Sequence, residues 1–330
     1  MNTPPIRDLV PIDRVWERMD AVEQRLIETA TSEEKGLTEI LQHLMGGGKR
    51  YRPLLGLVAA ELGPIDGSDP VEAAVAVELI HVGSLYHDDV IDEADSRRGV
   101  TSVNANWSNT VAILAGDFLL ARASEVAAPL GTEAVALLAR TYALLCEGQM
   151  LELTLANRLD TDPDDYFRVI DKKTASLIRT SARLGAMAGG ASPAEIETAT
   201  SWGHQVGMVF QLADDILDLV ATEDFLGKPA GSDIFEGTFT LPVLLAARGD
   251  DADRIELLLS GGKPYDPDAV AEVIDLVRKG GHVDTALSHV DAHIATAERA
   301  VAALPVGQVR DVLGGLGRYL VQRVEAARSA

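Results

Sequence analysis

The sequence predicts an all-α protein whose 330 residues form a single domain, 1–330. Hydrophobic residues make up 47% of the chain and aromatic residues only 5%, so alanine, leucine and valine carry the apolar content. This composition favours closely packed helices, because strands are enriched in β-branched and aromatic residues. Apolar residues recur with a helical period, no segment alternates convincingly as a strand would, and no long polar linker divides the chain.

The expected helices lie between clusters of glycine and proline. The first amphipathic helix covers 11–29, the second covers 33–44 before the glycine run 46–48, and the third covers 52–62 before Gly63-Pro64. Pro70 stands near the start of a long helix over 70–92, where its missing N–H is tolerated. The later expected helices are 108–127, 131–157, 164–188, 192–220, 238–248, 266–279, 283–303 and 308–327.

Further breaks are expected at Gly189-Gly190, Gly227-Lys228-Pro229 and Gly261-Gly262. Residues 249–282 are rich in aspartate and glycine, which is typical of a peripheral and variable part of a domain.

The charge balance of the chain argues against one class of function, nucleic-acid binding. Lysine and arginine number 29 against 51 aspartate and glutamate residues, which gives a formal net charge of −22. This disfavours a general nucleic-acid binder, because phosphate backbones need a basic surface. The one cysteine, Cys146, excludes an internal disulfide, the first residues lack an apolar signal core, and no stretch reaches about 18 charge-free apolar residues. These features predict a cytoplasmic protein.

Two aspartate clusters with the same spacing stand out. The first is Asp88-Asp89-Val90-Ile91-Asp92, and the second is Asp214-Asp215-Ile216-Leu217-Asp218. The outer aspartates of each cluster are four residues apart, so their carboxylates share one helix face, where like charges repel. One such cluster could be an ordinary acidic face, but two in apolar helices indicate bound cations. Carboxylates without histidine or cysteine partners favour a hard ion such as Mg²⁺. Because water and phosphate oxygens usually complete the coordination of Mg²⁺, the two clusters predict a diphosphate site.

The basic residues near these clusters are candidates for binding anions. Lys49 and Arg52 follow the glycine run at a helix start, where backbone N–H groups and the helix dipole favour an anion. Arg97 and Arg98 directly follow the first aspartate cluster. The glycine run is neither a P-loop nor a dinucleotide fingerprint, and no Ser-His-Asp or Cys-His constellation is found. His81 lies seven residues before Asp88 on roughly the same face, either as a ligand or as a core histidine.

Taken in order, these segments resemble the trans-prenyltransferases, also called polyprenyl synthetases or isoprenyl diphosphate synthases. The resemblance rests on GGGKRYRP, HVGSLYHDDVIDEADSRRG, the Gly116-Asp117 pair, KTASL, FQLADDILD and GKPAGSDIFEGTFTLP. It implies a homodimeric helical bundle of the isoprenoid synthase type around a deep central cavity, with the aspartate motifs on facing helices. It also implies two or three Mg²⁺ ions per active site and condensation of isopentenyl diphosphate onto an allylic diphosphate primer.

The resemblance also assigns roles to individual residues. Asp88, Asp92, Asp214 and Asp218 would bind Mg²⁺. Asp89 and Asp215 would support these ligands, as would Asp218. Isopentenyl diphosphate would contact Lys49, Arg52, His81 and Arg98, and the allylic diphosphate would contact Arg97, Lys173, Thr174, Gln211 and Lys228. The six aspartates with Lys173 and Lys228 form the expected catalytic set. Thr238 stands where many members have a further lysine for the allylic phosphate.

Small side chains before the first aspartate favour a long product. In this family an aromatic residue four or five positions before that aspartate stops chain growth, whereas here these positions are Ser84 and Gly83. With Ile80 one turn further back, they are the expected chain-length residues, and six to ten isoprene units are expected. The alternative is that Gly83 and Ser84 only allow close helix packing.

Other functions stay open at this point. A synthase of shorter geranylgeranyl or farnesyl products is the nearest alternative. A terpene cyclase would need no isopentenyl site, a non-catalytic partner subunit commonly lacks one aspartate motif, and a plain acidic helical scaffold would leave the ordered motifs unexplained. Loose membrane association is expected only for delivery of a long apolar product.

Overall fold

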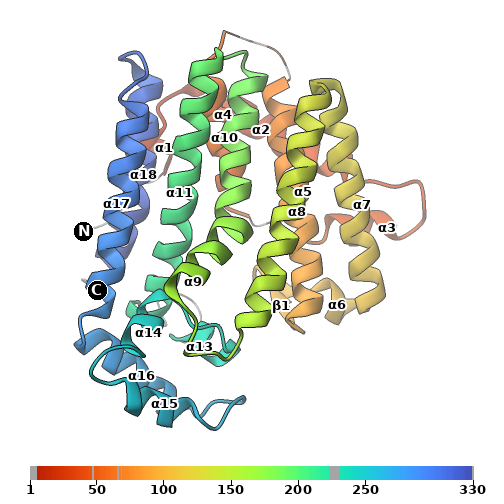
Figure 1. Ribbon diagram of the computed structural model, residues 1–330. Helices are drawn as coiled ribbons and strands as arrows, with labels where there is room; N and C mark the ends of the chain where they lie inside the picture. The colour runs from red at the N-terminus through yellow and green to blue at the C-terminus, as the bar shows by residue number, and fades with distance from the viewer. Residues whose placement is uncertain (1–5, 47, 65–66, 68, 223–229, 329–330) are drawn as a thin grey trace. The chain divides into compact units, whose positions relative to one another are not determined.

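A computed structural model describes residues 6–46, 48–64, 67, 69–222 and 230–328. Most of these residues are helical, and the prediction of an all-α protein is confirmed (Figure 1). The chain forms two compact units, which we call the N-terminal unit (10–142 and 180–200) and the C-terminal unit (6–9, 143–179 and 201–328). The expectation of one domain over 1–330 stays a prediction.

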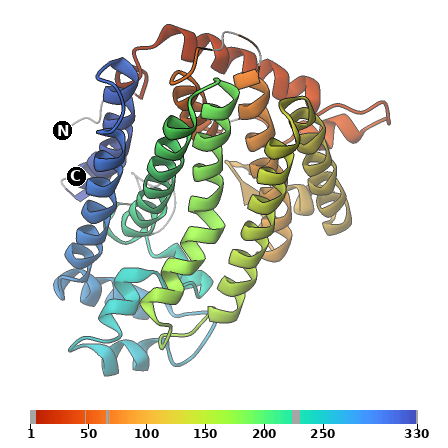
Figure 2. The same cartoon turned by 45° about the horizontal axis from the view of Figure 1, so that its top comes forward.

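The N-terminal unit is built around α5 (Asp69–Ile91). This helix is apolar on nearly every side, as a fully buried helix should be. It packs against α2, α4 and α7, and α5 and α7 run side by side in Figures 1 and 2. The unit's other elements are α2 (Asp13–Thr29), α3 (Leu37–Gln42), α4 (Tyr51–Ala60), α6 (Val103–Asn106), α7 (Asn109–Ala127), the 3₁₀ helix η1 (Ala128–Leu130) and the strands β1 (Ser96–Arg97) and β2 (Val100–Thr101).

Glycines allow helices of the N-terminal unit to pack closely. A Cβ on Gly83 of α5 would lie 3.1 Å from the carbonyl oxygen of Gly116 on α7. A Cβ on Gly185 of α10 (Ser176–Ala188) would lie 2.0 Å from the carbonyl oxygen of Gly56 on α4. Side chains larger than hydrogen at these positions would force the helix backbones apart.

The C-terminal unit contains the rest of the helices. Its elements are α1 (Ile6–Leu9), α9 (Pro163–Ile170), the π-helix η2 (Asp171–Ala175), α13 (Ser232–Glu236), α14 (Leu241–Ala246), α15 (Ala252–Leu259), α16 (Pro267–Lys279), α17 (His282–Val301) and α18 (Gln308–Arg328). The helices α8 (Thr132–Leu155), α10 and α11 (Pro193–Val220) contribute residues to both units. Trp202 of α11 is fully buried and donates its indole N–H to the carbonyl oxygen of Leu313 on α18 at 3.0 Å.

Several expected elements differ from the structure. The helix expected over 164–188 is α9, a π-helical turn and α10 in succession. The sequence shows no convincing alternating strand, but residues 96–101 of the structure form a short two-stranded antiparallel hairpin. Its strands are two residues long, which is too short for an alternating pattern to be visible. Between the helices expected over 238–248 and 266–279, the structure contains a further helix, α15.

None of the described helices is long and apolar enough to cross a membrane.

Candidate active site

The first aspartate motif lies at the C-terminal end of α5. The amide of Asp92 donates to the carbonyl oxygen of Asp88 at 2.8 Å, so the helical spacing that places these two carboxylates on one face is present. Asp88 is half-buried and Asp92 is exposed, whereas Asp89 is 0% exposed. Burial raises the pKa of Asp89, and the charge of Arg97 opposes that shift.

The hairpin after this motif carries both predicted arginines. Arg98 and Gly99 form its two-residue turn, and both have positive φ, as a type I′ turn requires. Arg97, which we expected to bind the allylic diphosphate, donates its Nε–H to Asp89 Oδ1 at 2.6 Å. Asn104 donates to the carbonyl oxygens of Asp89 and Ala94 at 3.1 Å. The hairpin is therefore fastened to the end of α5 by the buried member of the motif.

The residues expected to bind isopentenyl diphosphate all lie in the N-terminal unit. Lys49 lies two residues before α4, Arg52 lies in the first turn of that helix, His81 lies on α5, and Arg98 lies at the hairpin turn. Arg52 Nη1 lies 3.2 Å from His81 Nε2, and Arg98 Nη1 donates to the carbonyl oxygen of Leu44 at 2.8 Å. Burial, followed by the charges of Arg52 and Arg98, holds the pKa of His81 well below its ordinary value. His81 is therefore neutral at pH 7.

The second aspartate motif lies near the C-terminal end of α11. Asp214 is exposed, whereas Asp215 and Asp218 are buried. Asp218 Oδ1 accepts from the Ser232 hydroxyl at 2.5 Å and Oδ2 from the Asp233 amide at 3.2 Å, so this carboxylate caps the start of α13. Each motif therefore combines buried carboxylates, which hydrogen-bond inside their own unit, with carboxylates that reach solvent.

A hydrogen-bonded chain connects Asp215 with the predicted allylic residues. The Thr174 hydroxyl donates to Gln211 Oε1 at 2.7 Å, and Gln211 Nε2 donates to Asp215 Oδ1 at 2.7 Å. The Tyr166 hydroxyl donates to Asp215 Oδ2 at 2.5 Å. Burial raises the pKa of Asp215, and the hydrogen bonds from Tyr166 and Gln211 oppose that shift.

Lys173 and Thr174 lie within the π-helix η2. A Cβ on Gly148 of α8 would lie 2.7 Å from the amide nitrogen of Lys173, and one on Gly207 of α11 would lie 2.6 Å from Ala175 Cα. Two glycines thus let η2 press against α8 and α11, and π-turns of this kind are frequent at functional sites. Lys173 forms an ion pair with Glu152 of α8.

Lys228 lies outside the described residues. The amide of Thr238, at the position where we expected a lysine in many relatives, donates to the carbonyl oxygen of Asp233 at 2.8 Å.

The expected chain-length residues lie on α5. Ile80 and Gly83 are buried and Ser84 is half-buried, with its hydroxyl donating to the carbonyl oxygen of His81 at 2.9 Å. The close approach of Gly83 to Gly116 favours the packing alternative at position 83. Their role in setting product length stays a prediction.

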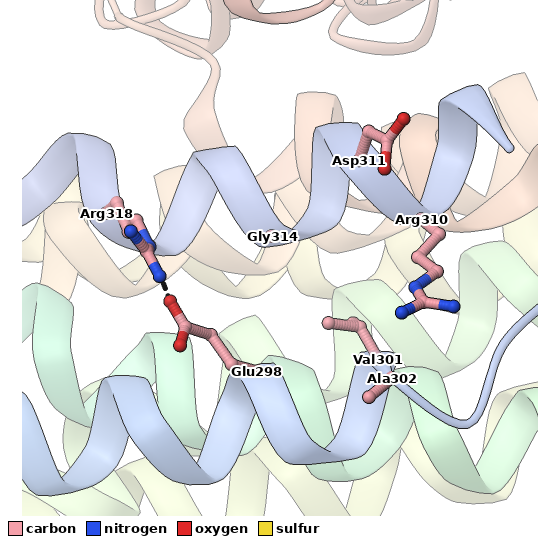
Figure 3. Close-up of a pocket in the computed structure, with 7 residues that line it drawn as sticks. All are labelled: Glu298, Val301, Ala302, Arg310, Asp311, Gly314 and Arg318. Carbon is pink, nitrogen blue, oxygen red and sulfur yellow. Dashed lines mark hydrogen bonds and ion pairs between the residues drawn. The ribbon is translucent and has the colours of Figure 1, made fainter. Parts of the chain in front are cut away.

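Two cavities of the C-terminal unit lie away from these residues. One of about 280 Å³ is bounded by α17 and α18, where Arg318 pairs with Glu298 (Figure 3). The other, of about 610 Å³, is lined by residues including Asn157, Phe239 and Tyr265. Neither is lined by an aspartate of the two motifs.

Sequence reasoning missed several residues that support the site. They are Arg50 and Glu78 beneath the predicted isopentenyl residues, Asn104 at the hairpin, Tyr166 beside Asp215, and Ser232 beside Asp218. Glu78 carried a signal, because it is a charged residue inside an apolar helix and lies three residues before His81. Tyr166 and Ser232 carried none, since their partners are 49 and 14 residues away in sequence.

Comparison with known proteins identifies the class of this one. The sequence model of the polyprenyl synthetase family matches residues 34–277, and the chain belongs to this family. It is 42% identical over 307 residues to the nonaprenyl diphosphate synthase of Mycobacterium tuberculosis, covering 92% of this chain and 91% of that protein. It is 40% identical to the heptaprenyl diphosphate synthase component 2 of Geobacillus stearothermophilus, covering 92% and 95% of the two chains.

Solved structures agree with this class. The geranylgeranyl pyrophosphate synthase of Corynebacterium glutamicum, complexed with calcium and isoprenyl diphosphate, is 41% identical with a TM-score of 0.84, and 94% of this chain and 96% of that chain are covered. The protein is therefore a trans-prenyltransferase of the isoprenyl diphosphate synthase type. The identification of the family from its ordered motifs is confirmed.

Proposed function

We propose that this enzyme is a magnesium-dependent polyprenyl diphosphate synthase that adds isopentenyl diphosphate repeatedly to an allylic diphosphate primer and makes a medium- or long-chain all-trans product. The observation that carries the proposal is the arrangement within the N-terminal unit. There, solvent-reaching carboxylates at the end of α5 adjoin a hairpin and a helix start that together present Lys49, Arg52 and Arg98. Acidic residues for a metal and cations for a second anionic group suit two diphosphate substrates.

The donor set fits magnesium. Among the described residues, no group of three histidine, cysteine, aspartate or glutamate side chains could hold a metal ion by itself. An ion held by Asp88 and Asp92, or by Asp214, would have to take its other ligands from water and phosphate oxygens, which is the habit of Mg²⁺. When bound, the metal would supply Lewis-acid neutralisation of the diphosphate charge. The relative from Corynebacterium glutamicum was solved with calcium and isoprenyl diphosphate, which supports a hard divalent ion.

The side chains would act mainly by electrostatics. Lys49, Arg52 and Arg98 would bind the diphosphate of isopentenyl diphosphate, while neutral His81 would donate one N–H. Lys173 and Thr174, together with Gln211, which accepts the hydrogen bond of the Thr174 hydroxyl, would bind the departing allylic diphosphate and stabilise the charge that develops on it. No side-chain nucleophile is required, because the double bond of isopentenyl diphosphate attacks the allylic carbon and the diphosphate can accept the proton.

The alternatives fit less well. A terpene cyclase would not need the cations around His81. A non-catalytic subunit would not need two complete aspartate motifs. A shorter-product synthase is the second candidate, because geranylgeranyl pyrophosphate synthases are among the similar structures. We further propose a cytoplasmic homodimer that associates loosely with membranes to release its product.

Product analysis tests the proposal. The enzyme is incubated with Mg²⁺, labelled isopentenyl diphosphate and, separately, C5, C10, C15 and C20 primers, and the products are sized by chromatography. Products of six to ten isoprene units are expected, and products that stop at C20 or below would favour the shorter synthase. Light scattering of the purified enzyme measures the oligomeric state, and a monomer would contradict the homodimer.

Variants of the aspartates test the assignment of the metal. Asp88→Ala and Asp214→Ala should each lose most turnover at any Mg²⁺ concentration, by about 100-fold or more if charge stabilisation is the main term. Asp291→Ala, which removes an exposed aspartate from α17, is the matched control and should retain full activity. Near-normal rates for Asp88→Ala and Asp214→Ala would contradict the metal assignment.

A further inference from the structure

A buried carboxylate, that of Glu78, lies close to residues predicted to bind isopentenyl diphosphate. Glu78 is 1% exposed and lies one helical turn before His81, so both side chains occupy the same side of α5. Its Oε1 accepts from Arg50 Nη1 at 2.8 Å and lies 3.9 Å from Arg98 Nη2. Burial raises the pKa of Glu78, while the charges of Arg50, Arg52 and Arg98 act against that shift.

Arg50 connects this carboxylate to the start of α4. Its guanidinium also donates to Glu23, through Nε at 2.7 Å and Nη2 at 3.1 Å, and to the carbonyl oxygen of Met45. Its backbone is left-handed, with φ of 48° and ψ of 35°, a conformation that is strained for a non-glycine residue and persists only where neighbouring contacts enforce it. Arg50 lies between Lys49 and Arg52, so the contacts that hold it also determine where those two side chains emerge.

Gly48 completes the arrangement. A Cβ at this position would lie 2.8 Å from Arg50 Nη1 and 3.0 Å from Arg98 Nη1, so the backbone of the glycine run lies directly against both guanidinium groups. Burial lowers the pKa of Arg98 and also that of Arg52, and mutual repulsion of the arginines adds to both shifts. Without the negative charge of Glu78, these arginines would repel each other, and their guanidinium groups would not stay close together.

We propose that Glu78 and Arg50 are positioning residues for isopentenyl diphosphate: Glu78 holds Arg98 and Arg50 in place, and Arg50 fixes the helix start that presents Lys49 and Arg52. This inference rests on the proposed function. One buried carboxylate among several cations leaves the cluster positive, so it orders the site and still leaves charge for a diphosphate. Preorganised cations of this kind bind more tightly because less ordering is needed on binding.

Steady-state kinetics of Glu78→Gln test the inference, because this variant keeps the side-chain shape and removes the charge. The KM for isopentenyl diphosphate should rise by about 10- to 100-fold, as expected for misplaced binding groups. The KM for the allylic primer and kcat should change less than about threefold, since the charges that act on Glu78 are those of Arg50, Arg52 and Arg98, none of which is assigned to the primer.

Glu61→Gln is the matched control. Glu61 is similarly buried in the N-terminal unit and accepts from Arg14 at 3.0 Å and from Arg18 at 2.8 Å, outside the predicted site. It should lower the melting temperature without changing either KM. Arg50→Lys, which keeps the charge but loses the forked contacts, should raise the KM for isopentenyl diphosphate selectively and decides the question if Glu78→Gln does not fold.

The outcomes distinguish a failure of the proposed function from a failure of the positioning role. A wild-type enzyme that condenses isopentenyl diphosphate with none of the primers would overturn the proposed function and this inference with it. An active wild type with an unchanged KM for isopentenyl diphosphate in the folded variant, or an equal rise in both KM values, would overturn the positioning role alone. A selective rise in Glu61→Gln as well would do the same.

Discussion

The carboxylate of Asp215 illustrates, at the scale of a residue, how a motif can be supported from a distance. Tyr166 and Gln211 each donate to one of its oxygens. Tyr166→Phe should destabilise the protein by about 1–3 kcal/mol, because it leaves a buried carboxylate with one donor fewer. It should also lower kcat, because Asp215 neighbours the predicted metal ligand Asp214.

Denaturant unfolding and turnover of Tyr166→Phe are compared with those of Tyr265→Phe. The Tyr265 hydroxyl donates to Asn157 at 2.9 Å in the same unit, and neither of these residues is assigned to the site. Tyr265→Phe should keep wild-type kcat. Equal kcat values for the two variants would contradict a role of Tyr166 in the site.

His81 should make stability depend on pH. It faces Arg52 from α4, Arg98 and Arg97 from the hairpin, and Arg50, with Glu78 one turn away on its own helix. Its pKa in the folded protein lies well below the 6.5 of an exposed histidine, so in acid the unfolded chain binds a proton that folded His81 does not. The stability that neutral His81 contributes is therefore complete above pH 6.5 and is lost as the pH falls below that value.

Unfolding of the wild type and of His81→Gln from about pH 7 to pH 5 measures this effect. The wild type should lose more stability than the variant on acidification, with a difference in slope of at most about 1.4 kcal/mol per pH unit. Parallel curves would show that His81 titrates normally.

At the scale of elements, close helix packing depends on glycine. Gly185→Ala would place a Cβ 2.0 Å from the carbonyl oxygen of Gly56, which is backbone and cannot rotate away. The expected destabilisation is about 1–3 kcal/mol, even after the gain in helix propensity. Gly314→Ala on α18 is the matched control, because nothing lies within 4 Å of its Cβ position, and it should stabilise by about 0.5–1 kcal/mol. Melting temperatures that move in the same direction for both variants would contradict the packing of α4 against α10.

The long helices were predictable from sequence, whereas the short elements were not. The helices expected over 11–29, 70–92, 192–220 and 308–327 begin and end within two residues of α2, α5, α11 and α18, because each has a long apolar period and a proline or glycine near an end. The hairpin at 96–101 and the π-turn at 171–175 are specified by tertiary contacts: Asp89 holds Arg97, and Gly148 and Gly207 make room for η2. A local pattern cannot express such contacts.

At the scale of the whole molecule, the ordered motifs were enough to name the family, because six segments in the right order rarely occur by chance. They did not distinguish carboxylates that reach solvent from those that hold the structure together. Asp88 and Asp89 are adjacent in sequence, yet one is half-buried and the other is completely buried beside Arg97. Which of two neighbouring aspartates faces the interior depends on the helix's orientation in the packed unit, and this information is spread over α5, α7 and the hairpin.

Product length also belongs to the whole enzyme, because each added isoprene unit must find apolar surroundings, worth roughly 0.8 kcal/mol for every buried methylene group. Ser84→Phe should shorten the product by at least one isoprene unit, since Ser84 is half-buried one turn before Asp88 and a phenyl ring there would occupy space next to the growing chain. Ser84→Ala removes only a hydroxyl that bonds to its own helix and should leave the product unchanged. Gly83→Phe is a poorer test, because its Cβ would lie 3.1 Å from the Gly116 carbonyl oxygen and the ring would push α7 away. Chromatograms of wild type, Ser84→Ala and Ser84→Phe with the same primer measure the effect, and identical product lengths in all three would show that another part of the enzyme limits chain growth.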